Sequence, residues 1–322
     1  MSGKAVRVFT VFLLLMAGGT HASAEIAAPS ESVTVTATKS REVLGKFAKA
    51  FETPTKLTGK IARWQRRVCP VAVGQEPAFT RFITQRVKYI ALAAGAPVNT
   101  EASCIPNIEI VFTATPQALL DNVRKNDPEY LGYAQSSAQK GALATVTRPI
   151  QAWYTTETVD FNGKRRPDSG GGDPDSTGST FDQANEAAGP EFDVRGLGMQ
   201  TSIKGLPQYM TSGSRIDDGI HSGFSHILIV IDSTKLAGQK IVPLADYISM
   251  LALTQLNSLD ACQQLPSIVN ILAANCGHAA DGLTQFDLAY LQGLYRMGAG
   301  RLPVLQRNEI ADTMTEILAK AK

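Results

Sequence analysis

The chain has little excess of positive over negative charge. Its 322 residues carry a net charge of +2, and the basic residues are scattered along the sequence. Nucleic-acid-binding domains usually gather Lys and Arg on one face. We therefore expect no nucleic-acid partner. The one short basic run, residues 164–166, lies close to Asp168 and is interpreted as a solvated loop.

Metal ligands are also scarce. The chain has four His, of which His221, His226 and His278 lie beyond the first 24 residues, and no two Cys have the CxxC spacing. Metal centres need several ligands held by rigid elements. Residues 173–178 resemble the start of a calcium loop, but the position that needs an acid is Ala184. We therefore predict no metal ligand, no cofactor and no catalytic residue of a recognised type.

Long apolar runs are absent except at the beginning. Residues 8–17 (VFTVFLLLMA) follow Lys4 and Arg7 and precede the small residues Ala22 and Ala24. This run is too short to span a bilayer comfortably, and the pattern is typical of a cleaved secretory signal. The sequence predicts a signal peptide over 1–24, export to the periplasm or the medium, and no membrane span after cleavage.

The cysteine count is low and even. An even number of Cys in an exported chain favours disulfides. Three pairings of Cys69, Cys104, Cys262 and Cys276 are possible. The pairs Cys69–Cys104 and Cys262–Cys276 close the shortest loops, and we predict these two. A zinc site is the alternative, although only His278 follows a Cys closely.

Hydrophobic patterning alternates between strand-like and helix-like periods. This order predicts an α+β or α/β fold, with a mixed β-sheet packed with helices. The expected strands are 68–74, 107–113, 144–157 and 226–233, and the expected helices are 41–51, 56–67, 76–95, 115–126, the segment opened by Pro243, 283–298 and 308–321. Pro149 interrupts the third strand and indicates an edge or a bulge. Thr284 and Asp287 have the spacing of a capping box.

Composition divides the chain into segments. After the signal, residues 25–52 are predicted to form a flexible leader with a strand-prone part, and 53–322 the main domain. Residues 158–195 are polar and rich in Gly. Such a segment cannot bury enough apolar surface to order itself. We expect a disordered insertion there.

The leader contains a possible partner-binding strand. From Glu31 to Thr38 the sequence ESVTVTAT alternates Val and Thr. With the residues that follow, it resembles the TonB box of outer-membrane receptors, which pairs with its partner as an added strand. This resemblance implies a protein partner. The alternative is an ordinary edge strand, since the chain lacks the barrel that usually accompanies the box.

A second resemblance covers residues 227–298. There LALTQLNSLDACQQLPSIVNIL, followed by GLTQFDLAYLQGLY, resembles a group of secreted bacterial proteins of unknown function related to zinc metallopeptidases, the zincins. The matching residues are Thr254, Gln255, Asp260, Ser267, Ile268, Leu283, Thr284, Asp287, Leu291, Leu294 and Tyr295. The resemblance implies a zincin-like arrangement of strands and helices. An unrelated buried helix over 248–256 is the alternative.

The catalytic positions of that family do not carry over. In its HExxH motif two His bind zinc and the Glu activates water. The matching positions here are Leu251, Ala252 and Gln255. Leu and Ala neither bind zinc nor transfer protons, and Gln is a poor ligand. We therefore expect an exported, non-catalytic binding or scaffold protein.

The alternative function is a hydrolase with an unrecognised site near His221, Ser225 and His226. The two functions differ in what the structure should show. A hydrolase needs those groups to converge in a polar cleft. A scaffold needs Leu251 and Ala252 packed in apolar surroundings.

Overall fold

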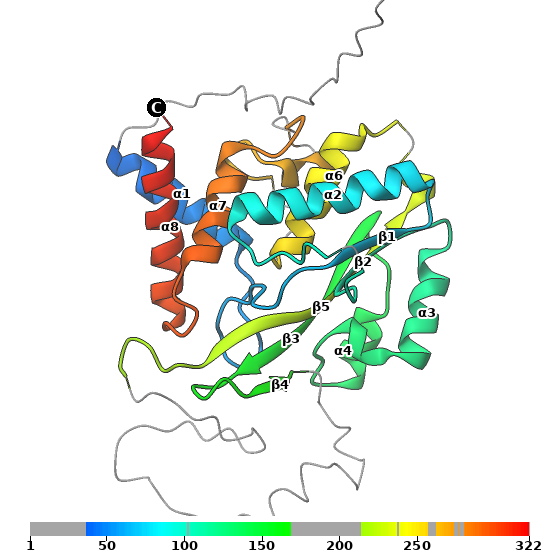
Figure 1. Cartoon of the computed structure of the whole chain (residues 1–322), viewed down its shortest axis with the longest axis horizontal. Coiled ribbons are helices and arrows are strands. Elements are labelled where there is room, and N and C mark those ends of the chain that lie inside the picture. The colour runs from blue at the N-terminus through cyan, green and yellow to red at the C-terminus, as the bar shows by residue number, and fades with distance from the viewer. Residues whose placement is uncertain are drawn as a thin grey trace, which may run out of the picture.

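The fold is built on a mixed five-stranded sheet with the order β1-β2-β5-β3-β4 (Figure 1). The computed structural model describes residues 37–101, 103–168, 214–236, 238–256, 262–273, 276 and 280–321. The strands are β1 (Pro70–Val73), β2 (Ile108–Thr113), β3 (Ile150–Val159), β4 (Arg165–Pro167) and β5 (His221–Asp232). Strands β1, β2 and β5 are parallel, whereas β3 is antiparallel to β5 and β4 to β3. The predicted α+β class with a mixed sheet is confirmed.

Helices cover both faces of the sheet. The α-helices are α1 (Ala37–Phe51), α2 (Pro77–Ala94), α3 (Pro116–Asn126), α4 (Ser137–Leu143), α6 (Ile241–Leu253), α7 (Gln285–Arg296) and α8 (Pro303–Lys320). Three short 3-10 helices are η1 (Pro128–Leu131), η3 (Ser233–Lys235) and η4 (Ile268–Leu272). Side chains alternate along a strand. In β5, Ile227 and Ile229 join the large core under α2, α6 and α7, while Leu228 and Val230 join a smaller cluster with α3.

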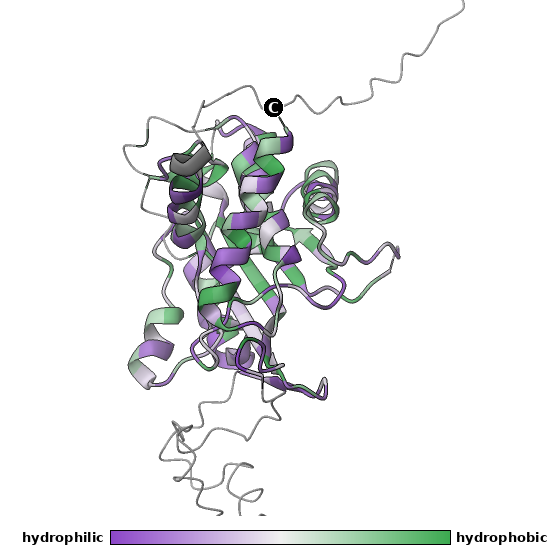
Figure 2. Cartoon of the chain, turned by 90° about the vertical axis from the view of Figure 1, so that its left-hand side faces the viewer, coloured by the Kyte–Doolittle hydropathy of each residue, from purple (hydrophilic) through white to green (hydrophobic). Residues whose placement is uncertain are grey.

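Helix α6 contributes to the large core, and in Figure 2 hydrophobic residues, coloured green, gather toward the middle of the described fold. Every residue from Pro243 to Leu253 is buried. A helix that is apolar on all sides is expected in the core of a protein. Leu251 is 1% exposed and Ala252 is 0% exposed. The prediction that both pack in the core is confirmed.

Local signals placed several helix ends correctly. Gly95 adopts φ 84°, and its N–H donates hydrogen bonds to the carbonyls of Ala91 and Leu92 near the end of α2. Only glycine takes this conformation without a steric penalty. Thr284 and Asp287 form the predicted capping box at the start of α7. The strand predicted over 144–157 is wrong in its first part, because β3 begins at Ile150 and Pro149 precedes the strand instead of interrupting it.

The helix predicted over 56–67 is wrong. This segment is extended and forms isolated bridges from Pro54 to Ile61 and from Arg63 to Gly223. Gly59 has φ 68°, which interrupts a helix. The indole of Trp64 donates to a carbonyl of α6. Tertiary contacts on both sides of the segment therefore override its helical periodicity.

The predicted flexible leader is wrong in its second half. Residues 37–51 form α1, which packs on α8. Leu44, Phe47 and Phe51 of α1 are buried in the main core. The helix is ordered because it contributes this apolar face. Most of the predicted partner strand, residues 31–36, lies outside the described residues, and Thr38 belongs to α1.

The predicted disordered insertion is wrong over residues 158–168. Residues 158–168 belong to the end of β3, a turn, and β4. Arg165 was assigned to a solvated loop, but it pairs with buried Glu157. Asp168 is buried and accepts hydrogen bonds from the hydroxyls of Thr156 and Thr158. These polar contacts hold in place a segment that is itself mostly polar. The remainder, 169–195, lies outside the described residues.

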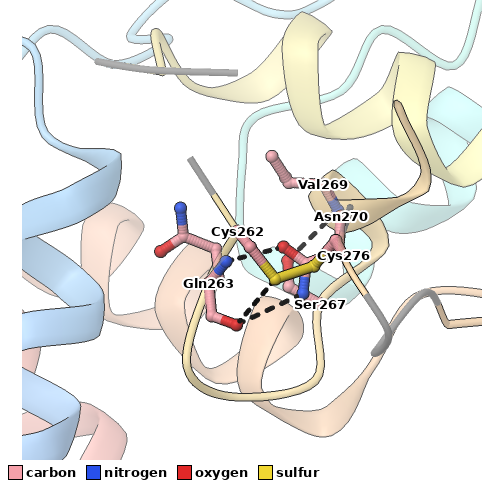
Figure 3. The surroundings of a disulfide bond; sticks show 6 residues. All are labelled: Cys262, Gln263, Ser267, Val269, Asn270 and Cys276. Atoms are coloured by element: carbon pink, nitrogen blue, oxygen red, sulfur yellow. Dashed lines mark hydrogen bonds between the residues drawn. A yellow bond between two sulfur atoms is a disulfide. The ribbon is translucent and has the colours of Figure 1, made fainter. Parts of the chain in front are cut away.

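Two disulfides join the predicted pairs. Cys69 bonds Cys104, and Cys262 bonds Cys276. In Figure 3 the second bond lies beside a pair of reciprocal contacts, in which Asn270 accepts from the N–H of Gln263 at 2.8 Å and donates to its carbonyl at 3.4 Å. Side-chain hydrogen bonds and a covalent bond thus hold the same turn.

Among the described residues, none of the helices combines the length and apolarity that a bilayer crossing requires.

Candidate functional site

A pocket of about 360 Å³ lies between β3 and the end of α6. Its walls come from five places in the sequence. They are residues 53–56, the turn 131–133 after η1, the end of α4 with the following loop to residue 148, β3 residues 151–156, and residues 251, 255 and 256 at the end of α6. Elements from both faces of the sheet therefore meet at one edge of it.

The edge of β3 that borders the pocket is open. Among the described residues, β4 pairs only with positions 157–159 of β3, so residues 150–156 have a strand partner on the β5 side alone. The N–H of Ile227 in β5 donates to the carbonyl of Asn107, on the β2 side of the strand. Residues two positions apart in a strand direct their N–H and C=O groups to the same side, so those of Ile229 also face β2. Ala152 lies opposite Ile229. The N–H and C=O of Ala152 therefore point away from the sheet, along the open edge.

Gly132 closes this edge farther along. It has φ 86°, and a Cβ built on it would lie 2.6 Å from the carbonyl oxygen of Tyr154. Only a glycine allows the chain to pass so close to that carbonyl. The accessible stretch of strand edge is thus short, and it is centred on Ala152.

Tyr154 ties this strand to the end of α6. Its hydroxyl lies 2.9 Å from the carbonyl oxygen of Leu251 and 3.2 Å from that of Thr254. The last four carbonyls of a helix have no partner within the helix. Burial raises the pKa of Tyr154, so the hydroxyl stays protonated and acts as a donor.

Two other aromatic side chains complete this cap. The indole N–H of Trp64 donates to the carbonyl of Ala252 at 2.7 Å, and the hydroxyl of Tyr295 donates to that of Leu253 at 2.9 Å. The end of α6 is thereby fixed by donors from three separate elements. The wall that α6 gives to the pocket is therefore held in place before any ligand binds.

The three positions matched to the metallopeptidase motif lie at this wall. Leu251 and Gln255 line the pocket, while Ala252 is fully buried behind it. An aliphatic and an amide side chain therefore stand where the resemblance places two zinc ligands. The described lining includes no His, Cys, Asp or Glu. Nor do the described residues contain a group of three or more such side chains arranged to hold a metal ion.

The residues of the alternative hydrolase site are not brought together. Ser225 is the extra residue of a β-bulge between the Thr155–His226 and Thr156–Phe224 pairs, and its hydroxyl donates to the carbonyl of Thr155. His221 is the first residue of β5, opposite Val159 and four positions before Ser225. None of the three candidate residues lines the pocket. No convergent nucleophile and base are therefore seen in this part of the chain.

His226 instead faces a small polar cluster that the sequence did not reveal. Tyr130 of η1 stacks on its ring with a centroid distance of 4.3 Å, and Glu109 of β2 lies 3.4 Å from Nε2. Burial lowers the pKa of His226, and Glu109 offsets part of this shift. The imidazole is therefore mainly neutral at neutral pH. The three residues of this cluster lie on β2, η1 and β5, which are separated in sequence, so a local pattern could not have found them.

Comparisons of the chain with protein-family models, with curated proteins and with solved structures found no match.

Proposed function

We propose that this chain is an exported, non-catalytic binding protein on a metallopeptidase-like scaffold. Its ligand is a short extended segment of polypeptide that occupies the pocket between β3 and α6. The observation that carries the proposal is the open edge at Ala152, whose outward N–H and C=O have no strand partner among the described residues and lie beside that pocket.

Main-chain pairing supports a peptide rather than another small ligand. A residue whose N–H and C=O both point outward can exchange two hydrogen bonds with one residue of an added strand. Binding by strand addition uses this pairing for affinity and neighbouring pockets for side-chain selection. Here the pocket of about 360 Å³ lies next to the edge and provides room for a side chain of the ligand.

The side chains that α6 and the residues after it place at the pocket support binding without catalysis. Leu251 cannot bind a metal ion or transfer a proton, and Gln255 is a weak ligand that does not titrate. Leu251 is 1% exposed and serves as a closed apolar backing of the wall, while the half-buried Gln255 amide can donate and accept hydrogen bonds.

Export is supported by the features of the N-terminus and by the disulfides. Residues 1–24 have the pattern of a secretory signal. All four cysteines are paired. Disulfides of this kind persist in oxidising compartments such as the periplasm or the medium.

Replacement of Ala152 by Pro tests the strand-addition step. Proline removes the outward N–H, but that group makes no ladder bond to β5, so the sheet should tolerate the change. The probe is a set of fluorescein-labelled heptapeptides with alternating Val and Thr, titrated by fluorescence anisotropy. We expect Ala152→Pro to weaken binding at least tenfold, while Ala152→Ser, which keeps the N–H, binds like the wild type.

Thermal unfolding of both variants controls for folding. Wild-type affinity in a folded Ala152→Pro variant would contradict the proposal, and so would a wild-type protein that binds none of the peptides. Cleavage of the peptides by the wild type would instead support the hydrolase.

A further inference from the structure

Two arginines that are far apart in the sequence contact one buried carboxylate near the edge of the sheet. Arg66 donates to Oε1 of Glu157 from Nε at 3.1 Å and to Oε2 from Nη2 at 2.6 Å. Arg165, on the edge strand β4 (Figure 1), donates to Oε1 from Nη1. The side chain of Glu157 is 3% exposed, whereas those of Arg66 and Arg165 are 50% and 37% exposed. Both guanidinium groups are therefore anchored on a buried group while part of each stays in contact with solvent.

The pairing of the strands explains how Arg165 reaches this carboxylate. Val159 of β3 pairs with Arg165 of β4 and with His221 of β5, so the three residues form one row across the sheet. Side chains of directly paired residues lie on the same face. Glu157, two positions before Val159, shares that face. The row therefore also places His221 on the face that carries the carboxylate.

The extended segment before β1 brings the second arginine to the same place. Arg63 forms a parallel bridge with Gly223, which is the β5 partner of Glu157. A Cβ built on Gly223 would lie 3.6 Å from the carbonyl oxygen of Arg63, so the segment passes close to a strand position that has no side chain. Arg66 follows three residues later and reaches Glu157 from there.

One arginine would be enough to satisfy Glu157. Arg66 already occupies both carboxylate oxygens, so Arg165 adds a second positive charge that this single carboxylate does not balance. A guanidinium has five N–H donors, of which Arg66 uses two and Arg165 one on Glu157. Within the described ranges neither arginine has another hydrogen-bond partner. Two like charges held side by side repel each other and attract an anion.

The surroundings of the pair strengthen this positive field. Arg67 and Lys164, which are next to the two arginines in the sequence, are exposed. The carboxylate of Asp168 accepts hydrogen bonds from threonine hydroxyls of β3 that alternate with Glu157, so it lies on the other face of the strand. Clustered charges of one sign raise the local concentration of an oppositely charged ligand.

We infer that Arg66 and Arg165 form a binding site for a phosphate-type oxyanion, separate from the pocket between β3 and α6. Neither arginine lines that pocket, and nor does Glu157. A tetrahedral dianion suits two guanidinium groups, because its oxygens can accept from both planar groups and its charge balances both. A carboxylate has only two oxygens, and a single arginine can satisfy it, as Arg66 does for Glu157. Because Glu157 holds both donors in place beforehand, the anion need not order them.

His221 gives the site an internal reporter. Burial lowers the pKa of this imidazole, and Arg165 is the largest of the nearby charges that lower it further. An anion bound to Arg165 would offset that charge, so the pKa of His221 should rise when the site is filled. His226, whose charged neighbour is Glu109, is the reference and should respond less.

Titration of the exported chain with sodium phosphate at constant ionic strength tests the site. NMR of the histidine ring protons over a series of pH values gives each pKa, and His221→Gln identifies the signal of His221. We expect phosphate to raise the pKa of His221 and sodium acetate at the same ionic strength to leave it unchanged. No response to phosphate, or an equal response to both salts, would overturn the inference.

The variant Arg165→Gln tests the arginine pair, since Arg66 continues to occupy both oxygens of Glu157 and should preserve the local fold. Calorimetric titration should show phosphate affinity reduced by about tenfold. Arg66→Lys keeps the charge but loses the planar group, so it should weaken binding severalfold. Lys164→Gln, which removes an exposed charge beside Arg165, is the matched control and should have little effect. Thermal unfolding checks that each variant is folded. A loss as large in Lys164→Gln as in Arg165→Gln would show attraction by diffuse charge and contradict a built site.

A soluble phosphate compound and the headgroup of a lipid offer the same chemistry, and vesicles separate the two sources. Cosedimentation compares phosphatidylcholine vesicles that contain about 20% phosphatidic acid, a phosphate monoester, with vesicles that contain the same share of phosphatidylglycerol, a diester. A preference for phosphatidic acid that Arg165→Gln abolishes identifies a lipid headgroup. Binding of free phosphate without retention on either vesicle identifies a soluble anion. Equal retention on both vesicles, kept by Arg165→Gln, assigns the binding to general surface charge and overturns the arginine site.

Discussion

The hydroxyl of Tyr154 lies 2.9 Å from the carbonyl oxygen of Leu251 and so joins the strand that borders the pocket to the helix that forms its wall. The same hydroxyl lies 3.2 Å from the carbonyl of Thr254. One oxygen atom therefore holds the last turn of α6 against β3. The shape of the pocket depends on this contact as much as on the residues that line it.

Replacement of Tyr154 by Phe should destabilise the protein by about 1–3 kcal/mol, because a buried helix carbonyl loses its donor. Chemical denaturation measures the change. Tyr89→Phe is the control, since Tyr89 is 48% exposed and its loss of a hydroxyl should have little effect. Equal stability of the wild type and Tyr154→Phe would show that solvent satisfies these carbonyls and that the end of α6 is open.

Leu251→Ala should cost on the order of 2–5 kcal/mol, because it removes apolar contacts and leaves a cavity. Leu251 lines the pocket and yet is 1% exposed, so nearly all of its surface is in contact with the core. Thermal unfolding compared with Leu92→Ala, at a leucine that is 59% exposed, separates a core residue from a surface one. A midpoint close to the wild type would mean that position 251 faces a working cleft.

The two disulfides should differ in their rates of reduction. Cys262 is exposed, whereas Cys69 is buried. Because a thiolate must reach the sulfur that it attacks, limiting reductant should open Cys262–Cys276 first. Alkylation of the released thiols followed by peptide mass mapping gives the order. First release of Cys69 and Cys104 would contradict this expectation.

Removal of the more buried bond should have the larger effect on stability. The Cys69–Cys104 bond closes a loop with a sequence separation of 35, compared with 14 for Cys262–Cys276. Its loss should destabilise by roughly 2–4 kcal/mol. The paired variants Cys69→Ser/Cys104→Ser and Cys262→Ser/Cys276→Ser, unfolded by denaturant, provide the comparison.

Much of the fold could be predicted from the sequence because local signals agreed with tertiary packing. Gly95 ends α2 and Thr284 begins α7 for reasons that lie within a few residues. The segment 56–67 was mispredicted because its conformation depends on Gly59 and on the bond from Trp64 to α6. Such long-range contacts leave no periodic pattern in the sequence.

The candidate site was less accessible to prediction. Leu251 and Gln255 could be singled out, since they match the positions of the two His in the HExxH motif. The open edge at Ala152 could not be predicted, because it depends on how many residues of β3 pair with β4.

Glu52 gives a prediction on pH dependence. It is 4% exposed, and Nε of Arg307 lies 2.6 Å from its Oε2, although the N–H is not directed at that oxygen. Burial raises the pKa of Glu52 from 4.5 to about 7, and Arg307 offsets only part of the shift. Between these values the unfolded chain has lost the proton that the folded protein keeps. Stability from this residue is therefore lost as the pH rises from about 4.5 to 7.

Glu52→Gln has no proton to lose and should remove this part of the pH dependence. We expect the variant and the wild type to be equally stable at pH 4, where both side chains are neutral. At pH 8 the variant should be more stable by about 3 kcal/mol, because the pKa of Glu52 rises by about 2.5 on folding and each pKa unit corresponds to roughly 1.4 kcal/mol. Denaturation at a series of pH values measures the difference. A variant that is less stable than the wild type at pH 8 would show that the ion pair with Arg307 outweighs the burial of the carboxylate.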